Sequence, residues 1–363
     1  MNQDCLKLTA YFGERQRTDG RFFAEQLLAL YGRERLATSI MLRGAAGFGP
    51  RHQLRTDSLL SLSEDPPVAV AAVDTAAKIA GLVDAVVDLT PRGLVTVERA
   101  RLIGAEQASD ADDFAMPPVA HGAVKLTVYV GRQQRVRRVP AYLAVCDLLF
   151  RRGLDGASAF LGVDGTAHGL RHRARFFGRN VDVPMMVIAI GDADHVGSVV
   201  PELHGLLRRP LMTIERVRVC KRDGALLSRP DTLPDKDFSG RPLHQKLMVY
   251  TAEDSLYDGM PVHRALIRRL RKAQCASGAT AIRGMWGFHD GRPPHGDRLF
   301  QLSRGVPVTT IVVDAPDRIA RSFDIVDEVT VQHGLVTSEM VPASMSIDAD
   351  SDCGHIELAS HDY

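Results

Sequence analysis

Two segments of the chain combine an arginine with closely spaced glycines and a phenylalanine. Successive glycines let backbone N–H groups turn towards one point and form an anion-binding concavity, and an adjacent arginine can contact a phosphate through two guanidinium nitrogens. The phenylalanine would offer an apolar surface for a base. We therefore expect these segments to bind a phosphate-bearing small molecule. The candidate residues are Arg43, Gly44, Gly47, Phe48 and Gly49 in the first segment, and Arg283, Gly284, Gly287 and Phe288, followed by Arg292, in the second.

The stretch from Gly44 to Pro66 is long for a connection within a compact domain. Long connections without secondary structure are usually functional or disordered, so this stretch is the predicted ligand loop. The alternative is that the glycines serve only a turn and that Arg43 pairs with a nearby carboxylate. Recurrence of the pattern at Arg283 favours the binding role.

Two further cations stand at matching places in the chain. Lys78 follows Asp74 by four residues, and Arg318 follows Asp314 by four, while His195 takes this place in the middle of the chain. A cation in the first turn of a helix is unfavourable to the helix dipole, and a bound phosphate would compensate for it. Lys78 and Arg318 are therefore candidate ligand contacts. The alternative is a solvated side chain on a helix surface.

The remaining reactive side chains form no catalytic or metal-binding pattern. No Ser/His/Asp or paired-carboxylate arrangement recurs, so we expect no catalytic residues and no enzyme activity. The histidines gather loosely in the same loops without the spacing of metal ligands, and we expect no metal site. Five scattered cysteines without a C-x-x-C pair are typical of reduced thiols in a cytoplasmic protein. The histidines concerned are His52, His168, His172, His289 and His295.

The candidate segments belong to a sequence that repeats three times. Each copy opens and closes with similar short segments, and these ordered matches predict three related domains joined by polar linkers and followed by a poorly ordered tail. The openings are Lys7–Gly13, Lys125–Gly131 and Lys246–Ala252, and the closings are Gly93–Thr96, Pro210–Thr213 and Gly334–Thr337. The predicted domains span 5–104, 123–220 and 244–343, the linkers Ala105–Gly122 and Lys221–Leu243, and the tail 344–363.

Hydrophobic periodicity within the first copy predicts the order β-α-β-β-α-β, a ferredoxin-like pattern in an α+β protein. Asp74 is the predicted N-cap of the second helix, and Asp314 takes the same role in the third copy with Pro316 in the first turn. The predicted elements are strands Leu6–Gly13, Thr38–Arg43, Val68–Val73 and Leu94–Ile103, a helix Arg21–Arg35 and a second helix after Asp74.

Three such units on one chain can solve each other's packing problem. A four-stranded sheet with helices on one face leaves its other face partly apolar, and a domain of this size buries a modest fraction of its surface. Heterologous contacts between three copies can close into a ring, and the linkers raise the effective concentration of each partner. We therefore expect an intramolecular pseudo-trimer. The alternative is three modules that stand apart.

The middle copy departs from the glycine pattern. We align Gly162 with the arginine, and the connection to Pro184 is then two residues shorter. This loop is expected to have lost the ligand role or to keep only a structural one. The ring would then be asymmetric, with fewer than three competent pockets.

Composition excludes several classes of protein. Lys plus Arg number 45 and Asp plus Glu 44 among 363 residues, so the net charge of +1 argues against nucleic-acid binding through bulk positive charge. Apolar residues at 45% and charged residues at 25% are typical of a globular protein. The longest apolar stretch, Val68–Leu89, is interrupted by charges, and the N-terminus lacks the pattern of a signal peptide. These features lead us to expect a cytoplasmic protein.

The motifs resemble those of the PII-like family known as domain of unknown function 190. The resemblance covers all three copies and is weakest in the second. It is carried by Lys7-Leu8-Thr9-x-Tyr11, Leu42-Arg43-Gly44-x-x-Gly47-Phe48-Gly49, Leu62-Ser63-x-Asp65-x-Pro67 and Gly93-Leu94-Val95-Thr96. Members of this family are similar in fold to PII signalling proteins, which are homotrimers of ferredoxin-like subunits. This resemblance implies that the chain is a single-chain version of such a trimer.

The resemblance also carries expectations about function. PII trimers bind adenine nucleotides between subunits and signal through the loop between the second and third strands, and some relatives are encoded near fluoride channels. It therefore implies an adenine nucleotide as ligand and a membrane transporter or channel as a conceivable regulatory target. Two features depart from the PII pattern. Asp74-Thr75-Ala76 lacks the glycine-rich turn of the PII nucleotide site, and Gly44–Ser63 contains no tyrosine for covalent modification.

We therefore expect a monomeric PII-like regulatory chain that binds a small phosphate-bearing ligand in clefts between repeats, with no nucleic acid as partner. Two alternatives stay open. One is a ligand-free structural or metal-tolerance protein resembling a trimer, and the other is a phosphate-handling enzyme on the same fold.

Overall fold

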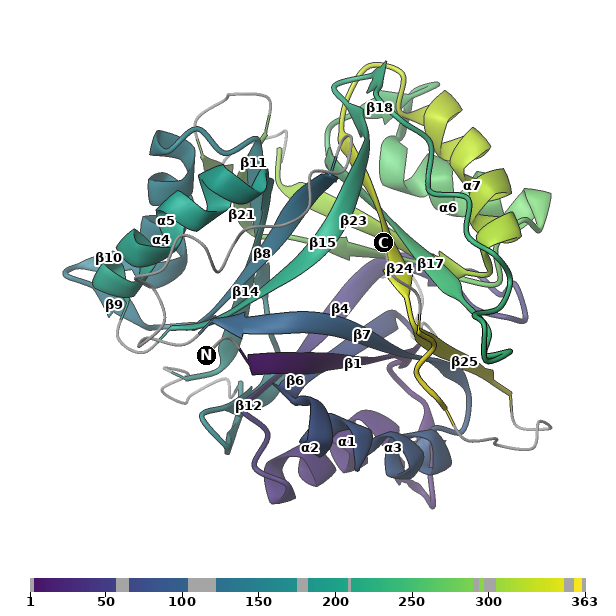
Figure 1. The fold of residues 1–363 in the computed structure, drawn as a ribbon, viewed down its shortest axis with the longest axis horizontal. Helices are drawn as coiled ribbons and strands as arrows, with labels where there is room; N and C mark the ends of the chain where they lie inside the picture. The colour runs from purple at the N-terminus through teal and green to yellow at the C-terminus, as the bar shows by residue number, and fades with distance from the viewer. Residues whose placement is uncertain are drawn as a thin grey trace.

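Three α+β repeats surround a common centre, with their strands inside and their helices in three groups outside (Figure 1). The computed structural model describes residues 3–56, 65–103, 122–174, 182–207, 210–289, 294–296, 305–348 and 356–360. In each repeat the four main strands are antiparallel, with the fourth strand beside the first, the first beside the third, and the third beside the second.

The main elements follow the same order in all three repeats. Repeat one contains β1 (Gln3–Gly13), α1 (Phe23–Arg33), β4 (Thr38–Phe48), β6 (Pro67–Thr75), α2 (Ala76–Ala80), α3 (Val83–Leu89) and β7 (Gly93–Ile103). Repeat two contains β8 (Gly122–Gly131), α4 (Ala141–Arg151), β11 (Gly156–Leu161), β14 (Pro184–Gly191), α5 (Ala193–Leu206) and β15 (Leu211–Arg222). Repeat three contains β17 (His244–Ala252), α6 (Val262–Ala273), β20 (Ala279–Arg283), β23 (Pro307–Asp314), α7 (Pro316–Val329) and β24 (Leu335–Val341).

Short strands form three separate hairpins or extend the large sheet. A small hairpin follows each first strand: β2 (Arg17–Thr18) with β3 (Arg21–Phe22), β9 (Arg135–Val136) with β10 (Val139–Pro140), and β18 (Leu256–Tyr257) with β19 (Met260–Pro261). The others are β5 (Arg55–Thr56), β12 (Asp164–Ala167), β13 (Leu170–Arg173), β16 (Ala225–Leu226), β21 (Trp286–His289), β22 (His295–Gly296) and β25 (Ala343–Ile347).

Strand alternation divides the interior into an outer and a central core. On β1, Leu6, Leu8 and Ala10 pack against the helices of their own repeat, whereas Cys5 and Tyr11 face the centre. Successive side chains of a strand point to opposite faces, so one strand serves both cores. The central core collects apolar residues from all three repeats, and it is therefore the surface that a single repeat would leave uncovered.

The glycine-containing segments are strands that join one repeat to another, not turns at the start of a loop. The end of β4 pairs with β20, β21 pairs with β11, and β12 pairs with the start of β4. Each repeat gives one such contact and receives one, so the three contacts close a ring. The predicted end of the second strand at Arg43 was therefore wrong, because β4 continues to Phe48 along a neighbouring repeat.

Glycine is required in these joints because two backbones approach closely. A Cβ on Gly47 would lie 2.7 Å from the carbonyl oxygen of Ala279, and one on Gly44 would lie 2.7 Å from Cγ of Pro67. Gly287 meets the carbonyl of Ala157 in the same way.

The aromatic residue of each motif anchors its joint. Phe48 is buried in the core of repeat three, and Phe288 in the core of repeat two. Full burial of such a side chain stabilises a contact by roughly 1.5–3 kcal/mol. In the third joint Thr166 takes this place, and its hydroxyl and backbone N–H lie 3.0 and 2.9 Å from the Ser39 hydroxyl oxygen. One joint is thus hydrogen-bonded where the other two are apolar.

The middle copy keeps both glycines, which corrects the sequence alignment by one residue. Gly162 contacts Pro184, as Gly44 contacts Pro67, and Gly165 meets the carbonyl of Ser39. Leu161, not Gly162, therefore stands in the place of Arg43. The prediction that this segment breaks the glycine pattern was wrong, although it does lack the arginine.

The fourth strands form a second ring of contacts. β7 pairs with β15, β15 pairs with β24, and β25 pairs with β7. The predicted disorder of the tail was wrong for its described part, because Ala343–Ile347 is the strand that completes this ring. Further along, the backbone N–H of Ala359 donates to the Pro342 carbonyl over 2.8 Å.

The predicted N-caps are displaced by one residue. Thr75 and Ala315 are the N-cap residues of α2 and α7, while Pro316 does lie in the first turn of α7. Asp74 instead accepts a hydrogen bond from the backbone N–H of Ala37 over 2.8 Å. This aspartate connects the end of the third strand to the start of the second.

The close approach at Gly47 generates a prediction. Gly47→Ala should lower the free energy of unfolding by about 1–3 kcal/mol, because the added methyl group meets a backbone carbonyl that cannot move freely. Gly49→Ala is the matched control, since its Cβ would have no atom within 4 Å. Urea unfolding followed by circular dichroism measures both. Equal stability of the two variants would show that the joint is loose.

Candidate functional site

The strand joints leave three equivalent clefts between repeats. Cleft one lies between repeats one and three, cleft two between repeats three and two, and cleft three between repeats two and one. Each is lined by the end of a first strand, by the joint segment that follows, and by the start of the neighbour's second strand. Clefts at such internal interfaces are common binding sites for small molecules.

Cleft one combines an apolar floor with a cationic rim. It holds about 850 Å³, counted out to open solvent, and its floor includes Phe48, Leu94 and Ile311. His52 stacks on Phe48 with ring centroids 5.4 Å apart. Glycine backbone forms part of the wall at Gly49 and Gly278, and at Gly49 no side chain or backbone atom lies where a Cβ would be. A flat apolar group could therefore approach the wall closely.

Three arginines line cleft one. Arg51 and Arg92 both donate to Asp348, with Nη2 and Nε at 3.0 and 2.9 Å from its Oδ1. Arg55 lies 3.0 Å from Asp65, and its guanidinium packs where Gly13 leaves room. All these side chains are partly exposed. They can therefore exchange a protein carboxylate for another anion at modest cost, because exposed ion pairs contribute little stability.

The described linings of the other two clefts contain fewer cations. Cleft two holds about 1110 Å³, and its lining includes a single arginine, Arg222, which is paired with Asp155 at 2.6 Å. Cleft three holds about 490 Å³, and none of its described lining residues is an arginine or lysine. Among the described lining residues of these three clefts, those of cleft one therefore include the most arginines.

The two motif arginines lie away from the cleft. The Nε of Arg43 donates to Glu14 over 2.6 Å, and Arg43 lines a separate groove together with Arg171 and Arg173. Arg283 pairs with Glu253 at 2.6 Å in the same manner. The sequence left this pairing of Arg43 with a carboxylate open as the alternative to a ligand role. A ligand role for these arginines stays a prediction.

The glycines and phenylalanines of the motifs thus separate into two groups, those that line a cleft and those that lie in a strand joint. Phe48 and Gly49 line cleft one, whereas Gly44, Gly47, Gly284 and Gly287 serve the strand joints. Phe288 lines cleft two, the corresponding place one repeat further on.

Lys78 and Arg318 line none of these three clefts. The Nζ of Lys78 donates to Asp74 over 3.1 Å and to the Arg35 carbonyl over 2.9 Å. Arg318 lies 4.0 Å from Asp314. Each cation is therefore paired with the aspartate at the end of the third strand, and its contact with a phosphate stays a prediction.

Some candidates cannot be placed. Arg292 lies outside the described residues, and nothing is described of the His295 side chain. Among the other histidines, His168 lines cleft three and His289 lines cleft two.

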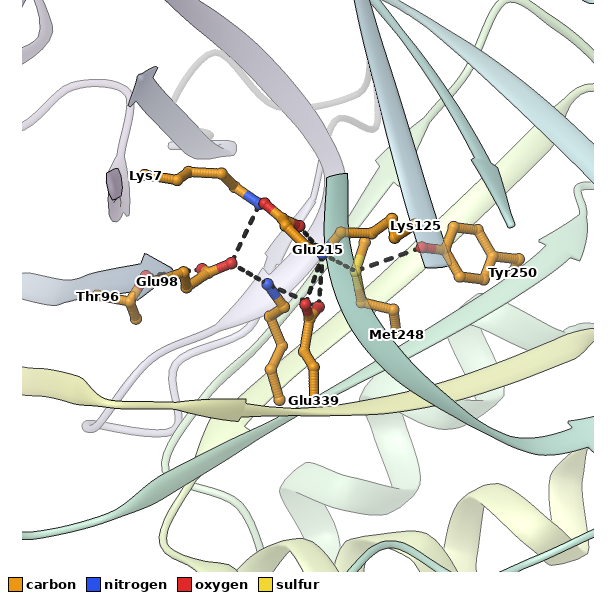
Figure 2. A network of polar contacts seen from close by, with 9 residues as sticks. Lys7, Thr96, Glu98, Lys125, Glu215, Met248, Tyr250 and Glu339 are labelled. Atoms are coloured by element: carbon orange, nitrogen blue, oxygen red, sulfur yellow. Dashed lines mark hydrogen bonds and ion pairs between the residues drawn. The ribbon is translucent and has the colours of Figure 1, made fainter. Parts of the chain in front are cut away.

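A second polar cluster lies at the centre of the ring (Figure 2). We call it the central hexad: the lysine near the start of each first strand and the glutamate opposite it on each fourth strand. Within a repeat the two residues lie opposite each other on adjacent strands, as Lys7 on β1 pairs with Glu98 on β7. Each lysine also reaches the glutamate of the next repeat, so charges alternate around a closed ring. The hexad comprises Lys7, Lys125, Lys246, Glu98, Glu215 and Glu339.

The hexad is almost entirely buried, and its opposite charges form ion pairs with one another. Lys7 lies 3.1 Å from Glu98 and 2.9 Å from Glu215, while Lys246 lies 2.8 Å from Glu339. Burial alone would raise the pKa of Glu98, but attraction by Lys246 and Lys7 outweighs it and keeps that pKa well below its usual range. The same balance lowers the pKa of Glu215 to about 2.

The glutamates alone would resemble a metal site, since their oxygens lie within 4.8 Å of one another. Three ammonium groups already neutralise them, so no cation is needed for charge balance. The lysines and the threonines Thr96, Thr213 and Thr337 lie in the segments that match between repeats, but those segments end before the glutamate two residues further on. A charge that recurs inside an apolar strand of every repeat was the signal that could have identified the hexad.

Breaking the hexad should destabilise the whole chain. Glu215→Gln leaves Lys7 and Lys125 with one carboxylate partner fewer in a buried site, and we expect a loss of about 3–5 kcal/mol in the free energy of unfolding. Glu202→Gln, which removes a partly exposed partner of Arg152, should cost less than about 1 kcal/mol. Urea unfolding measures both.

Should Glu215→Gln fail to fold, a double variant keeps this prediction testable. Changing Lys125 and Glu215 to methionine together removes one charge of each sign and should recover part of the loss. If Glu215→Gln is no worse than Glu202→Gln, the hexad contributes no more than a surface pair.

The depressed glutamate pKa values also predict loss of stability in acid. The pKa of glutamate in an unfolded chain is about 4.3, so the unfolded state binds protons first as the pH falls. The contribution of Glu98 and Glu215 should be complete above about pH 5 and decline towards the folded-state pKa of Glu215, about 2. Urea midpoints at pH 6, 5, 4 and 3 test this. Midpoints that stay constant down to pH 3 would contradict it.

Comparison with known proteins agrees with the repeat architecture. The family model DUF190, described as "Uncharacterized ACR", matches residues 5–102, 123–219 and 244–343. A UPF0166 protein of Aquifex aeolicus (strain VF5) is 31% identical over 103 residues, which cover 28% of this chain and 94% of that protein. That relative thus corresponds in length to about one repeat. No helix in the described part of the chain combines the length and apolar character needed to cross a bilayer. The chain belongs to the DUF190 family and carries its domain in three tandem copies.

Proposed function

We propose that this chain is a PII-like regulatory protein that binds a nucleotide, or another phosphate-bearing small molecule, in cleft one. The observation that carries the proposal is the combination found there: an apolar floor between two repeats and three arginines at its rim. Such a cleft fits a ligand with one flat apolar part and one strongly anionic part.

The fold supports the comparison with a PII trimer. Each repeat has the element order and strand order of a ferredoxin-like unit, and two rings of strand pairing join the three repeats. We infer from this a single-chain pseudo-trimer, in which cleft one corresponds to one nucleotide site between subunits.

The position of the arginines suggests how binding would produce a signal. Arg51 and Arg55 lie on the connection between β4 and β6, which also carries Phe48 and Gly49 to the cleft. A ligand that contacts these residues would bias the conformation of this connection, and a partner could read that change. A membrane transporter or channel as that partner stays a prediction.

We propose binding without turnover. No histidine, cysteine or lysine is among the described residues lining cleft one, and the nearby carboxylates of Asp65 and Asp348 are paired with its arginines, so we propose no general base there. A phosphate-handling enzyme is therefore less favoured by the cleft, and a ligand-free structural protein is the outcome that failed binding would support.

Titration calorimetry tests the proposed function. ATP, ADP, AMP and cyclic AMP are titrated into the chain, and we expect at least one to bind with about one site per chain. Arg55→Ala should weaken that binding roughly 10- to 100-fold, the effect of losing one charge-assisted hydrogen bond to a phosphate. Arg321→Ala, which removes an exposed arginine paired with Asp317, is the matched control and should bind as the wild type does.

A second variant distinguishes cleft one from the motif arginines. If the ligand binds in cleft one alone, Arg43→Ala combined with Arg283→Ala leaves the affinity unchanged, because both side chains are paired away from the cleft. Loss of binding in this double variant, with full binding in Arg55→Ala, would place the ligand on the motif arginines. Absence of binding by all four nucleotides would favour the ligand-free alternative.

A further inference from the structure

The carboxylate of Asp348 already occupies an anion position at cleft one. The Arg51 guanidinium donates to it twice, with Nη2 3.0 Å from Oδ1 and Nε 3.2 Å from Oδ2. The Nε of Arg92 adds a third donor at 2.9 Å. Three N–H groups from two arginines thus converge on one carboxylate, which is the geometry that a phosphate oxygen would also satisfy.

These three residues come from separate parts of the chain. Arg51 follows β4 on the connection to β6, and Arg92 precedes β7. Asp348 follows β25, whose last residue, Ile347, pairs with Gly93. Ser346 of the same strand lines cleft one. The strand that completes the ring of fourth strands therefore delivers the carboxylate to the cleft.

This arrangement differs from the one in cleft two. Asp223 of repeat two donates its backbone N–H to Gly334, the counterpart of Gly93, so the register places Gly224 where Asp348 stands and His333 where Arg92 stands. Cleft two thus has neither the carboxylate nor the second arginine at this position.

We infer that Asp348 is an internal competitor for the ligand. The phosphate group of the ligand takes the place of the Asp348 carboxylate between Arg51 and Arg92, and the end of β25 is released. This inference rests on the proposed function and adds regulation to the same site. Coupling between two equilibria is reciprocal. The contact of Asp348 with the arginines therefore weakens ligand binding, and a bound ligand weakens the contact of β25 with β7.

The physical balance makes such an exchange feasible. The side chains of Arg51, Arg92 and Asp348 are 45%, 34% and 35% exposed, so their ion pairs are screened by solvent. A phosphate carries more charge and more acceptor oxygens than a carboxylate and can bind both arginines at once. The carboxylate has the opposite advantage of being attached to the chain, which raises its effective concentration.

The test compares two probes on four proteins. Inorganic pyrophosphate and ATP are titrated by calorimetry into the wild type, Asp348→Asn, Arg51→Ala combined with Arg92→Ala, and Asp317→Asn. Asp348→Asn should bind both probes roughly three- to ten-fold more tightly, the factor expected when one partly exposed ionic competitor is removed. The double arginine variant should lose pyrophosphate binding. Asp317→Asn, from the exposed pair with Arg321, should match the wild type.

The outcomes separate this inference from the proposed function. Equal affinity of the wild type and Asp348→Asn for ATP would overturn the competition while leaving nucleotide binding intact. Tighter pyrophosphate binding by Asp348→Asn, with no nucleotide bound by either protein, would support the competition and reject the nucleotide. Binding of neither probe by either protein would reject both.

Hydrogen exchange gives a second and independent readout. Saturating ATP should speed exchange of the backbone amides of Ala343–Ile347 in the wild type, because the end of β25 is freed from its contact at Asp348. In Asp348→Asn these amides should already exchange faster without ligand. Exchange that is unchanged when ATP binds would contradict the release of the strand.

Discussion

The central hexad is the interaction on which the rest of the structure depends. Each repeat places a lysine and a glutamate opposite each other on the inward face of its sheet, where apolar neighbours exclude water. One such pair would bury two charges with few partners, which costs more than it returns. Three pairs in a ring give every lysine two carboxylates. The geometry therefore favours three repeats in one cyclic arrangement.

Around this centre, the sequence repeats have diverged in the contacts that join them. Phe48 and Phe288 anchor two joints in apolar cores, whereas Thr166 uses hydrogen bonds to Ser39 in the third. A homotrimer must use one residue at all three places, but a single chain can adjust each place separately. The same freedom explains why cleft one has three arginines while its counterparts have one or none among their described lining residues.

Local patterns in the sequence were sufficient for the order of elements but not for the long-range contacts. Alternation in Leu6–Gly13 and helical spacing after Arg21 predicted β1 and α1, because each depends on neighbours along the chain. The role of Gly47 could not be read in this way, since it depends on the carbonyl of Ala279 in another repeat. Cleft one is likewise assembled from repeats one and three and from β25. Of the predicted site residues, only Phe48 and Gly49 line it.

Along the described joints, the two rings of strand pairing leave neither edge of a repeat's sheet unpaired. The outer side of each second strand is covered by a segment of one neighbour, and that of each fourth strand by the other. Unpaired sheet edges are where proteins add strands from other molecules and aggregate. A repeat that detaches would thus expose edges on both neighbours as well as its own. Partial unfolding would therefore lose strand pairing and also expose edges that promote aggregation. We expect the three homologous repeats to unfold as one cooperative unit.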